Sequence, residues 1–395
     1  MISRKYTYRL LILTGIVQVS GGCVEEFEFG TQNFEDILVV ESTITNELKS
    51  QKVSISRTFR LENEGPVPEQ NARVSILDNQ GTTYTFVEEN PGVYLSSSTF
   101  TAESGRSYQL QITTQDEKSY ASQFVTLPQV TQIDNIKAER VINDQGVAGV
   151  GILVDSFDPT GNANFYRYEF EETYQIIPPF FSCIQLAIIS NDPPVIDIAP
   201  RTREERVCYR TDISNSIILN TTGTLAESNV KDFVVRFIPP DDAVLRNRYS
   251  ILVKQFVQSA EAYEFYETLS NFSDSESLFT QIQPGFIEGN VQSVDNPDES
   301  VLGFFEAASV STARVFVNLK DVLPGVFRPD FQVRCALLNQ RGVTDNEIRE
   351  IIRLVEGGFR LFTFDATTNV YSLATPICTD CNVLGTNVRP DFWED

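Results

Sequence analysis

The sequence predicts a mainly β protein, with an immunoglobulin-like β-sandwich followed by a larger β-rich domain that carries two short amphipathic helices. Three observations lead to this prediction. Short segments with alternating apolar and polar residues recur from residue 34 onwards, and clusters of Asn, Asp, Pro and Gly separate them. Only two segments carry an apolar stripe at helical spacing. With 41% hydrophobic residues, the chain can bury a sizeable core.

Residues 34–127 form the expected immunoglobulin-like sandwich. In one segment Tyr108, Leu110 and Ile112 alternate with polar residues, as one buried and one solvated face require. Closely spaced short strands of this kind are typical of such sandwiches, although the Cys…Trp…Cys pattern of antibody domains is absent. The predicted strands are Ile37–Ile44, Val53–Phe59, Ala72–Leu77, Thr83–Val87, Gly92–Leu95, Tyr108–Thr114 and Tyr120–Thr126.

Residues 128–395 form the second predicted domain, which begins after the Leu127-Pro128 boundary. The stretch from Cys183 to Cys208 is polar and rich in proline, so it is predicted to be a loop. The predicted strands are Ile133–Val141, Val147–Asp155, Phe165–Glu172, Asp232–Phe237, Tyr249–Val257, Val301–Phe305, Ala313–Leu319, Gln332–Leu338 and Phe359–Phe364.

Two apolar stripes predict helices in the second domain. Ser259 can cap the first helix, while Thr344 and Glu347 form a capping-box pattern before the second, which Gly357-Gly358 would end. Both stripes are expected to face a core, since this is what amphipathic helices usually do. The stripe residues are Ala262, Phe265, Tyr266 and Leu269 in the first helix, and Ile348, Ile351, Ile352 and Val355 in the second.

The composition excludes several classes of function. The chain contains no histidine, which removes Ser-His-Asp and Cys-His catalysis and histidine-ligated metal sites. A net charge of −23 opposes binding to nucleic acid, because phosphates would meet repulsion. No P-loop or GxGxxG pattern is present. We therefore expect no cofactor and no enzymatic activity, although paired carboxylates could in principle serve a hydrolase.

The first 22 residues resemble a secretory signal peptide. Arg4, Lys5 and Arg9 precede an apolar run that ends in Ser20-Gly21-Gly22, directly before Cys23. The run is only about ten residues, whereas a membrane-spanning helix needs about 20. Small residues before a cysteine resemble a bacterial lipobox, so Cys23 is the predicted lipidation site. An ordinary cleavable signal with a chance cysteine is the alternative.

Residues 23–33 are expected to form an acidic tether behind the lipid anchor. Glu25, Glu26 and Glu28 follow Cys23 and resemble the acidic export signal of surface lipoproteins in the Bacteroidota. This pattern predicts a lipid-anchored protein of the outer membrane that faces the cell surface, with the membrane as a partner through the anchor. A solvated acidic spacer without export function is the alternative reading.

Five further cysteines are disulfide candidates in an oxidising compartment. Cys183 is expected to pair with Cys208 across the proline-rich loop. Cys378 and Cys381 form a CxxC that could close on itself or give one sulfur to Cys335. A redox or zinc role for the CxxC has less support, because it lies in a tail, and no histidine or second CxxC completes a zinc site.

Two other groups of residues are candidate sites. Asp155, Asp158 and Asn162 place oxygen atoms in a loop that could bind calcium, but Asp-Pro-x-Gly-Asn is also a good turn. Trp393, the only tryptophan, and Phe392 lie close to the carboxyl terminus. They are candidates for a partner interface, and the alternative is a plug that pins the tail to the second domain.

Several segments together resemble a family of Bacteroidota outer-membrane lipoproteins known only as domain of unknown function four-two-four-nine. The matching segments extend over essentially the whole chain after Cys23. They are Leu38-Val39-Val40-Glu41, Arg57-Thr58, Gly92-Val93-Tyr94, residues 249–269, Gln283-Pro284-Gly285, Gly289-Asn290-Val291, Val301-Leu302-Gly303-Phe304-Phe305, Arg314, Cys378-x-x-Cys381 and Arg389-Pro390-Asp391-Phe392-Trp393.

The resemblance implies a gene beside that of a TonB-dependent receptor, and it assigns no catalytic residues. It favours a non-catalytic accessory that helps such a receptor to capture or take up a ligand, whose identity the sequence does not reveal. Two alternatives stay open. One is a structural or adhesive surface module that binds another protein through the edge of the first sandwich. The other is a hydrolase that uses carboxylates.

Overall fold

The computed structural model describes residues 37–59, 65–273, 287 and 289–395. It confirms the mainly β class, and both predicted amphipathic helices are present as α2 (Ala260–Ser273) and α4 (Asp345–Glu356). The predicted signal peptide, the lipidation site Cys23 and the acidic tether lie outside the described residues, as does Gln283-Pro284-Gly285.

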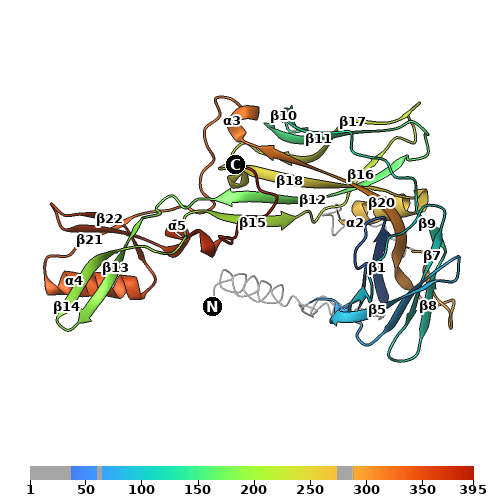
Figure 1. Cartoon of the computed structure of the whole chain (residues 1–395), viewed down its shortest axis with the longest axis horizontal. Coiled ribbons are helices and arrows are strands. Elements are labelled where there is room, and N and C mark those ends of the chain that lie inside the picture. The colour runs from blue at the N-terminus through green and yellow to red at the C-terminus, as the bar shows by residue number, and fades with distance from the viewer. Residues whose placement is uncertain (1–36, 60–64, 274–286, 288) are drawn as a thin grey trace, which may run out of the picture.

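The amino-terminal strands fold around one core, at the lower right of Figure 1. Strand β5 pairs with both β4 and β6, so the sheet turns over and its two halves share buried side chains such as Ile76, Tyr94 and Tyr108. Every strand predicted for residues 34–127 is found, the last one in two pieces. The strands are β1 (Leu38–Thr45), β2 (Lys52–Arg57), β3 (Val67–Pro68), β4 (Arg73–Asp78), β5 (Thr83–Asn90), β6 (Val93–Ser96), β7 (Ser107–Thr113), β8 (Ser119–Ser122) and β9 (Val125–Thr126).

Later parts of the chain complete this first sandwich. Strand β19 (Val291–Ser293) pairs with β8, and β20 (Val301–Val317) pairs with β1. Their side chains Val291 and Phe305 belong to the same buried cluster as β1 and β7. The sequence boundary at Leu127 stays a prediction, and in space the first core takes in residues far beyond it.

Strand β20 joins the two halves of the molecule. The segments predicted as two strands, Val301–Phe305 and Ala313–Leu319, belong to one strand of 17 residues that ends at Val317. Its first half runs parallel to β1, and its second half runs antiparallel to β18 (Tyr249–Val257). The result is one continuous 15-stranded sheet.

A three-stranded sheet lies on the second half of this large sheet (Figure 1). Aromatic and branched side chains from both layers, among them Ile152, Tyr168 and Ile251, form one core. The covering sheet contains β10 (Asn135–Ile142), β11 (Ala148–Asp158) and β17 (Ser228–Ile238), and the lower layer contains β12 (Phe165–Ile176), β15 (Cys208–Ile213), β16 (Ile218–Thr221), β18 and β20. Two short helices, η1 (Ala243–Leu245) and α3 (Leu319–Val322), lie before β18 and after β20.

A separate lobe, which we call the arm, extends to the left in Figure 1. Helix α4 packs Ile351 and Leu354 against Leu373 and against the isoleucines of a β-hairpin. The capping box of Thr344 and Glu347 starts this helix as predicted. The arm contains β13 (Ile184–Asn191), β14 (Pro194–Pro200), β21 (Leu338–Arg341), α4, β22 (Arg360–Asp365), β23 (Val370–Ala374), α5 (Pro376–Thr379) and η2 (Cys381–Val383).

Two local predictions in the arm are wrong. The stretch from Cys183 to Cys208 is mainly a hairpin of β13 and β14, because its prolines lie at the turn and the strand end while isoleucines between them face α4. The predicted strand Gln332–Leu338 is absent. Only Leu338 begins a strand, β21, which pairs with β23.

The disulfides differ from the predicted pairing. Cys208 is bonded to Cys381 and Cys335 to Cys378, while Cys183 is free and exposed. The Cys183–Cys208 prediction is wrong because Cys183 lies at the base of the hairpin, opposite Arg201, whereas Cys208 lies on β15 in the second sandwich. The expected alternative in which the CxxC gives one sulfur to Cys335 is confirmed. The other sulfur, on Cys381, ties the carboxyl-terminal tail to the second sandwich.

Gly303 permits the close approach of β20 to β1. Its φ is 153°, and a Cβ atom there would lie 2.2 Å from the carbonyl oxygen of Val40. We predict that Gly303→Ala lowers the free energy of unfolding by about 3 kcal/mol, because strain and overpacking add at this point. Gly223→Ala, where no backbone atom is among the nearest neighbours, is the matched control. Equal denaturant midpoints for the two variants would contradict this role of Gly303.

The disulfide pattern predicts a single accessible thiol in the chain from Val24 onward. Maleimide labelling without reductant should modify Cys183 alone, because Cys208, Cys381, Cys335 and Cys378 are paired. Peptide mass spectrometry after labelling reads out the site. Modification of Cys208 or Cys335 in the folded protein would contradict the pairing.

Candidate functional site

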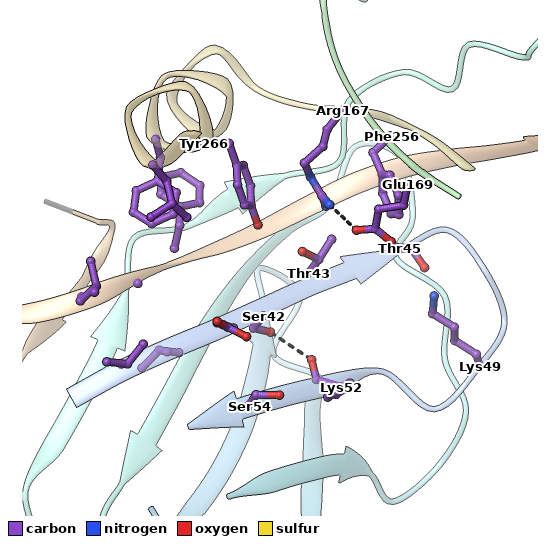
Figure 2. Close-up of a pocket in the computed structure, with 18 residues that line it drawn as sticks. Ser42, Thr43, Thr45, Lys49, Lys52, Ser54, Arg167, Glu169, Phe256 and Tyr266 are labelled. Atoms are coloured by element: carbon purple, nitrogen blue, oxygen red, sulfur yellow. Dashed lines mark hydrogen bonds and ion pairs between the residues drawn. The ribbon is translucent and has the colours of Figure 1, made fainter. Parts of the chain in front are cut away.

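A groove with a volume of about 510 Å³ lies where the two sandwiches meet (Figure 2). Strands β1 and β20, helix α2, and the strands β12 and β18 supply its walls. We call it the junction groove. Its lining residues are Val39, Val40, Glu41, Ser42, Thr43, Thr45, Lys49, Lys52, Ser54, Arg167, Glu169, Phe256, Phe265, Tyr266, Leu269, Leu302, Gly303 and Phe304.

Alternation along β1 supplies one wall of the junction groove. Leu38 and Val40 are buried in the first sandwich, so Val39, Glu41 and Thr43 point to the opposite face. Helix α2 supplies the apolar wall. Its predicted stripe only partly enters a core, because Ala262 is buried while Phe265, Tyr266 and Leu269 line the groove.

A buried ionic network lies at the inner end of the junction groove. Arg167 on β12 pairs with Glu169 and, at 2.8 Å, with Glu306 on β20. Glu306 also accepts hydrogen bonds from Thr43 Oγ1 at 2.9 Å and from Gln258 Nε2 at 2.7 Å. Since Thr43 lies on β1, the network connects both sandwiches.

Two aromatic rings enclose the Arg167 guanidinium, and Figure 2 shows Tyr266 and Phe256 on either side of it. Its central carbon lies 4.4 Å from the Phe256 ring centroid and 4.7 Å from that of Tyr266. Such cation–π contacts strengthen when water is excluded. The rings therefore hold the cation in place and shield its ion pairs from solvent.

Burial and the neighbouring charges determine the protonation states of Arg167 and Tyr266. Burial lowers the pKa of Arg167, but Glu306, Tyr266 and Glu169 together more than offset this, and the net pKa shift is upward. Burial and Glu306 raise the pKa of Tyr266. Arg167 is therefore charged and Tyr266 neutral at ordinary pH. Within the described residues, Arg167 Nε is buried without a hydrogen-bond partner, so one donor at the groove is left unused.

The open side of the junction groove carries charges of both signs. Lys49 pairs with Glu47 at 2.5 Å, and Lys52 and Glu41 are exposed nearby. Burial raises the pKa of Glu47, but the hydrogen bonds from Lys49 and Thr45 and the nearby positive charges together more than offset this, and the net shift is downward. The groove thus combines an apolar aromatic wall with polar and charged groups, which suits an organic ligand that has both characters.

The calcium candidates stabilise a turn. Asp158 accepts backbone N–H bonds from Thr160, Asn162 and Ala163 at 2.8–2.9 Å, and these lower its pKa although burial opposes them. Asp155 accepts instead from the backbone N–H of Asp232, which lowers its pKa as well. In the part of the chain that the structure describes, no group of three or more acidic or cysteine residues could hold a metal ion.

The tail residues take different positions. Trp393 is buried and meets the rings of Tyr209 and Phe316 edge-on, with centroids 4.9 and 5.6 Å away. It therefore pins the tail to the second sandwich, as the alternative reading expected. Phe392 lies under Arg314, whose guanidinium carbon is 3.5 Å from the ring centroid, and the ring is partly exposed. Only Phe392 is left as an interface candidate.

Sequence reasoning did not identify Arg167, Glu306 or Gln258 as site residues. A signal was available, because Glu306 interrupts the apolar run from Val301 to Ala308 and Arg167 lies between Tyr166 and Tyr168. Charged residues are almost never fully buried unless they are paired. What the sequence could not supply was the pairing of β1 with β20, which brings these residues together.

The protein is mainly β, and its two β-sandwiches share a strand and form the junction groove, a candidate binding site, where they meet. A family model described as Domain of unknown function (DUF4249) matches residues 24–314, and the chain belongs to this family. The matched range includes every wall of the junction groove and ends before β21 and α4 of the arm. No curated protein matches the chain. No helix among the described residues combines the length and apolar character needed to cross a membrane.

The buried network predicts a large effect of Glu306→Gln. The change removes the charge of Glu306, the buried carboxylate that pairs with Arg167, and leaves the guanidinium buried. The free energy of unfolding should therefore fall by about 3 kcal/mol. Glu350→Gln removes an exposed helix-surface ion pair and should change it by less than about 0.5 kcal/mol. Chemical denaturation of both variants measures the difference. A Glu306→Gln effect as small as that of Glu350→Gln would refute the network's structural role.

Proposed function

We propose that this protein is a surface-exposed, lipid-anchored component of the outer membrane that captures a ligand as a non-catalytic accessory of a TonB-dependent receptor. The observation that carries the binding part is the junction groove, whose aromatic wall comes largely from helix α2 and whose buried cation on β12 is paired with β20. The membrane and receptor parts are supported by the lipobox-like segment before Cys23 and by the resemblance of the chain to outer-membrane lipoproteins.

Capture fits the junction groove better than hydrolysis does. Glu169 and Glu306 are the carboxylates nearest to its inner end, and both are held by Arg167. A glycosidase needs one carboxyl group free to donate a proton and another free to attack or to activate water. Two carboxylates that neutralise the same guanidinium are occupied by that role, so the hydrolase alternative gains no support here.

The adhesive alternative also gains little support. It requires a free edge on the first sandwich, and in the described residues β20 covers β1 while β19 covers β8. The short β19 is itself an edge, but three residues offer few backbone groups for strand addition. We therefore favour binding in the junction groove over binding along an edge.

The receptor partnership predicts a specific copurification. Outer membranes solubilised in mild detergent, from cells with a carboxyl-terminal tag on the native gene, should yield a TonB-dependent barrel in a near-stoichiometric amount. Mass spectrometry identifies it, and a tagged unrelated lipoprotein of the same cells is the control. Recovery of the chain without any barrel would contradict the accessory role.

Lipidation at Cys23 predicts that this residue determines whether the protein is in the membrane fraction or in the soluble fraction. Cys23→Ser should move most of the chain from the membrane fraction to the soluble fraction, because the acyl chains supply the membrane affinity. Cys183→Ser is the matched control and should leave the protein in the membrane fraction, since that thiol is free and exposed. Immunoblots of the fractions report the result, and membrane retention of Cys23→Ser would argue against lipidation at this residue.

A further inference from the structure

A second cavity of about 440 Å³ lies at the other end of the same strands. The junction groove meets β18 near Phe256 and β20 near Gly303, whereas this cavity adjoins the start of β18 and the end of β20. Its polar lining comes from the turn before β18, the start of α3 and the loop after α3. These side chains are Arg246, Asn247, Arg248, Asn318, Lys320 and Arg328.

Four of these residues are cationic, in a chain whose net charge is −23. Elsewhere most arginines have a carboxylate partner, as in Arg106–Asp78 and Arg353–Glu350. The described residues contain no ion pair for Arg246, Arg248, Arg328 or Lys320. The nearest acid on α3, Asp321, accepts a hydrogen bond from Asn318 Nδ2 at 2.9 Å. Positive charge therefore gathers here with no ion pair among the described residues, and Asp330 is the acid whose charge acts on Arg246.

Neutral acceptors hold the arginines in place. Arg328 Nε donates to the backbone oxygen of Arg246 at 2.8 Å, and Arg328 Nη2 donates to Asn247. Arg248 Nε donates to the backbone oxygen of Glu394 at 2.6 Å. These bonds fix the positions of the side chains and leave their charges uncompensated. An arrangement of this kind is pre-organised for an anion.

The positive charge of Arg328 affects the pKa of Arg246. Burial lowers the pKa of Arg246, the charge of Arg328 lowers it further, and Asp330 opposes this only in part. In addition, Arg246 Nε is buried and has no hydrogen-bond partner among the described residues. An anion in the cavity would offset the repulsion between Arg246 and Arg328, and it could accept a hydrogen bond from Arg246 Nε.

We propose that this cavity binds a small ligand through an oxyanion group, either a phosphate or a carboxylate, held by Arg246, Arg328 and Lys320. Guanidinium groups suit both anions because their N–H donors match two oxygens at once. Phe327 lies beside Arg328 and is 93% exposed, so it offers an apolar contact to the body of such a ligand. The proposal is independent of the junction groove, because the two sites lie at opposite ends of β18 and β20.

Lys320 provides the cleanest test, because its side chain is exposed and forms no hydrogen bond or ion pair within the described range. Calorimetric titration of the full mature chain with pyrophosphate, and separately with citrate, should show saturable binding that sodium chloride at equal ionic strength does not reproduce. Lys320→Gln should weaken binding about threefold to tenfold. Lys231→Gln, the same change at an exposed position of β17, should leave the affinity unchanged.

A second variant separates binding from folding. Arg328→Gln should weaken binding at least as much as Lys320→Gln, and its melting temperature shows whether the loop still folds. Saturation by pyrophosphate alone identifies the phosphate form of the ligand, and saturation by citrate alone identifies the carboxylate form. The proposal is overturned if neither anion binds more tightly than chloride, or if Lys320→Gln binds both as well as Lys231→Gln does.

Discussion

The pairing of one strand with two different partners holds this molecule together. Strand β20 runs parallel to β1 and then antiparallel to β18, so two sandwiches with separate cores share a single sheet. A strand of this length spans roughly 55 Å. The parallel half depends on Gly303, where any side chain would meet the backbone of β1. Asn290 supports the same region, because its side-chain amide bonds both backbone groups of Phe305.

The two candidate sites follow from this shared sheet. At the β1 end, the sandwiches leave a groove, and Arg167 in its lining pairs with the buried Glu306. At the other end, the turn before β18 and the loop after α3 bring arginines together without carboxylate partners. One site is thus neutralised internally and lined by aromatic rings, whereas the other keeps an excess of positive charge. This difference indicates ligands of different chemistry for the two ends.

The sequence predicted those parts of the fold that depend on local patterns. Alternation located nearly every strand of the first sandwich, and capping residues located the start of α4. Long-range pairing lay beyond it, since nothing local indicates that Leu38 will lie opposite Val301 or that Cys208 will find Cys381. The prolines near residue 193 also concealed the hairpin that faces α4. For the same reason, Arg167 and Glu306 were not recognised as partners before the fold placed them together.

The proposed function requires the junction groove to hold a ligand while the protein is bound to a membrane receptor. An electron cryo-microscopy structure of the native complex, purified from outer membranes in mild detergent, tests it most directly. We expect a barrel in contact with this chain and ligand density in the groove beside Tyr266 and Arg167. A complex in which the groove is filled by side chains of the partner, or in which the ligand lies elsewhere on the chain, would contradict it.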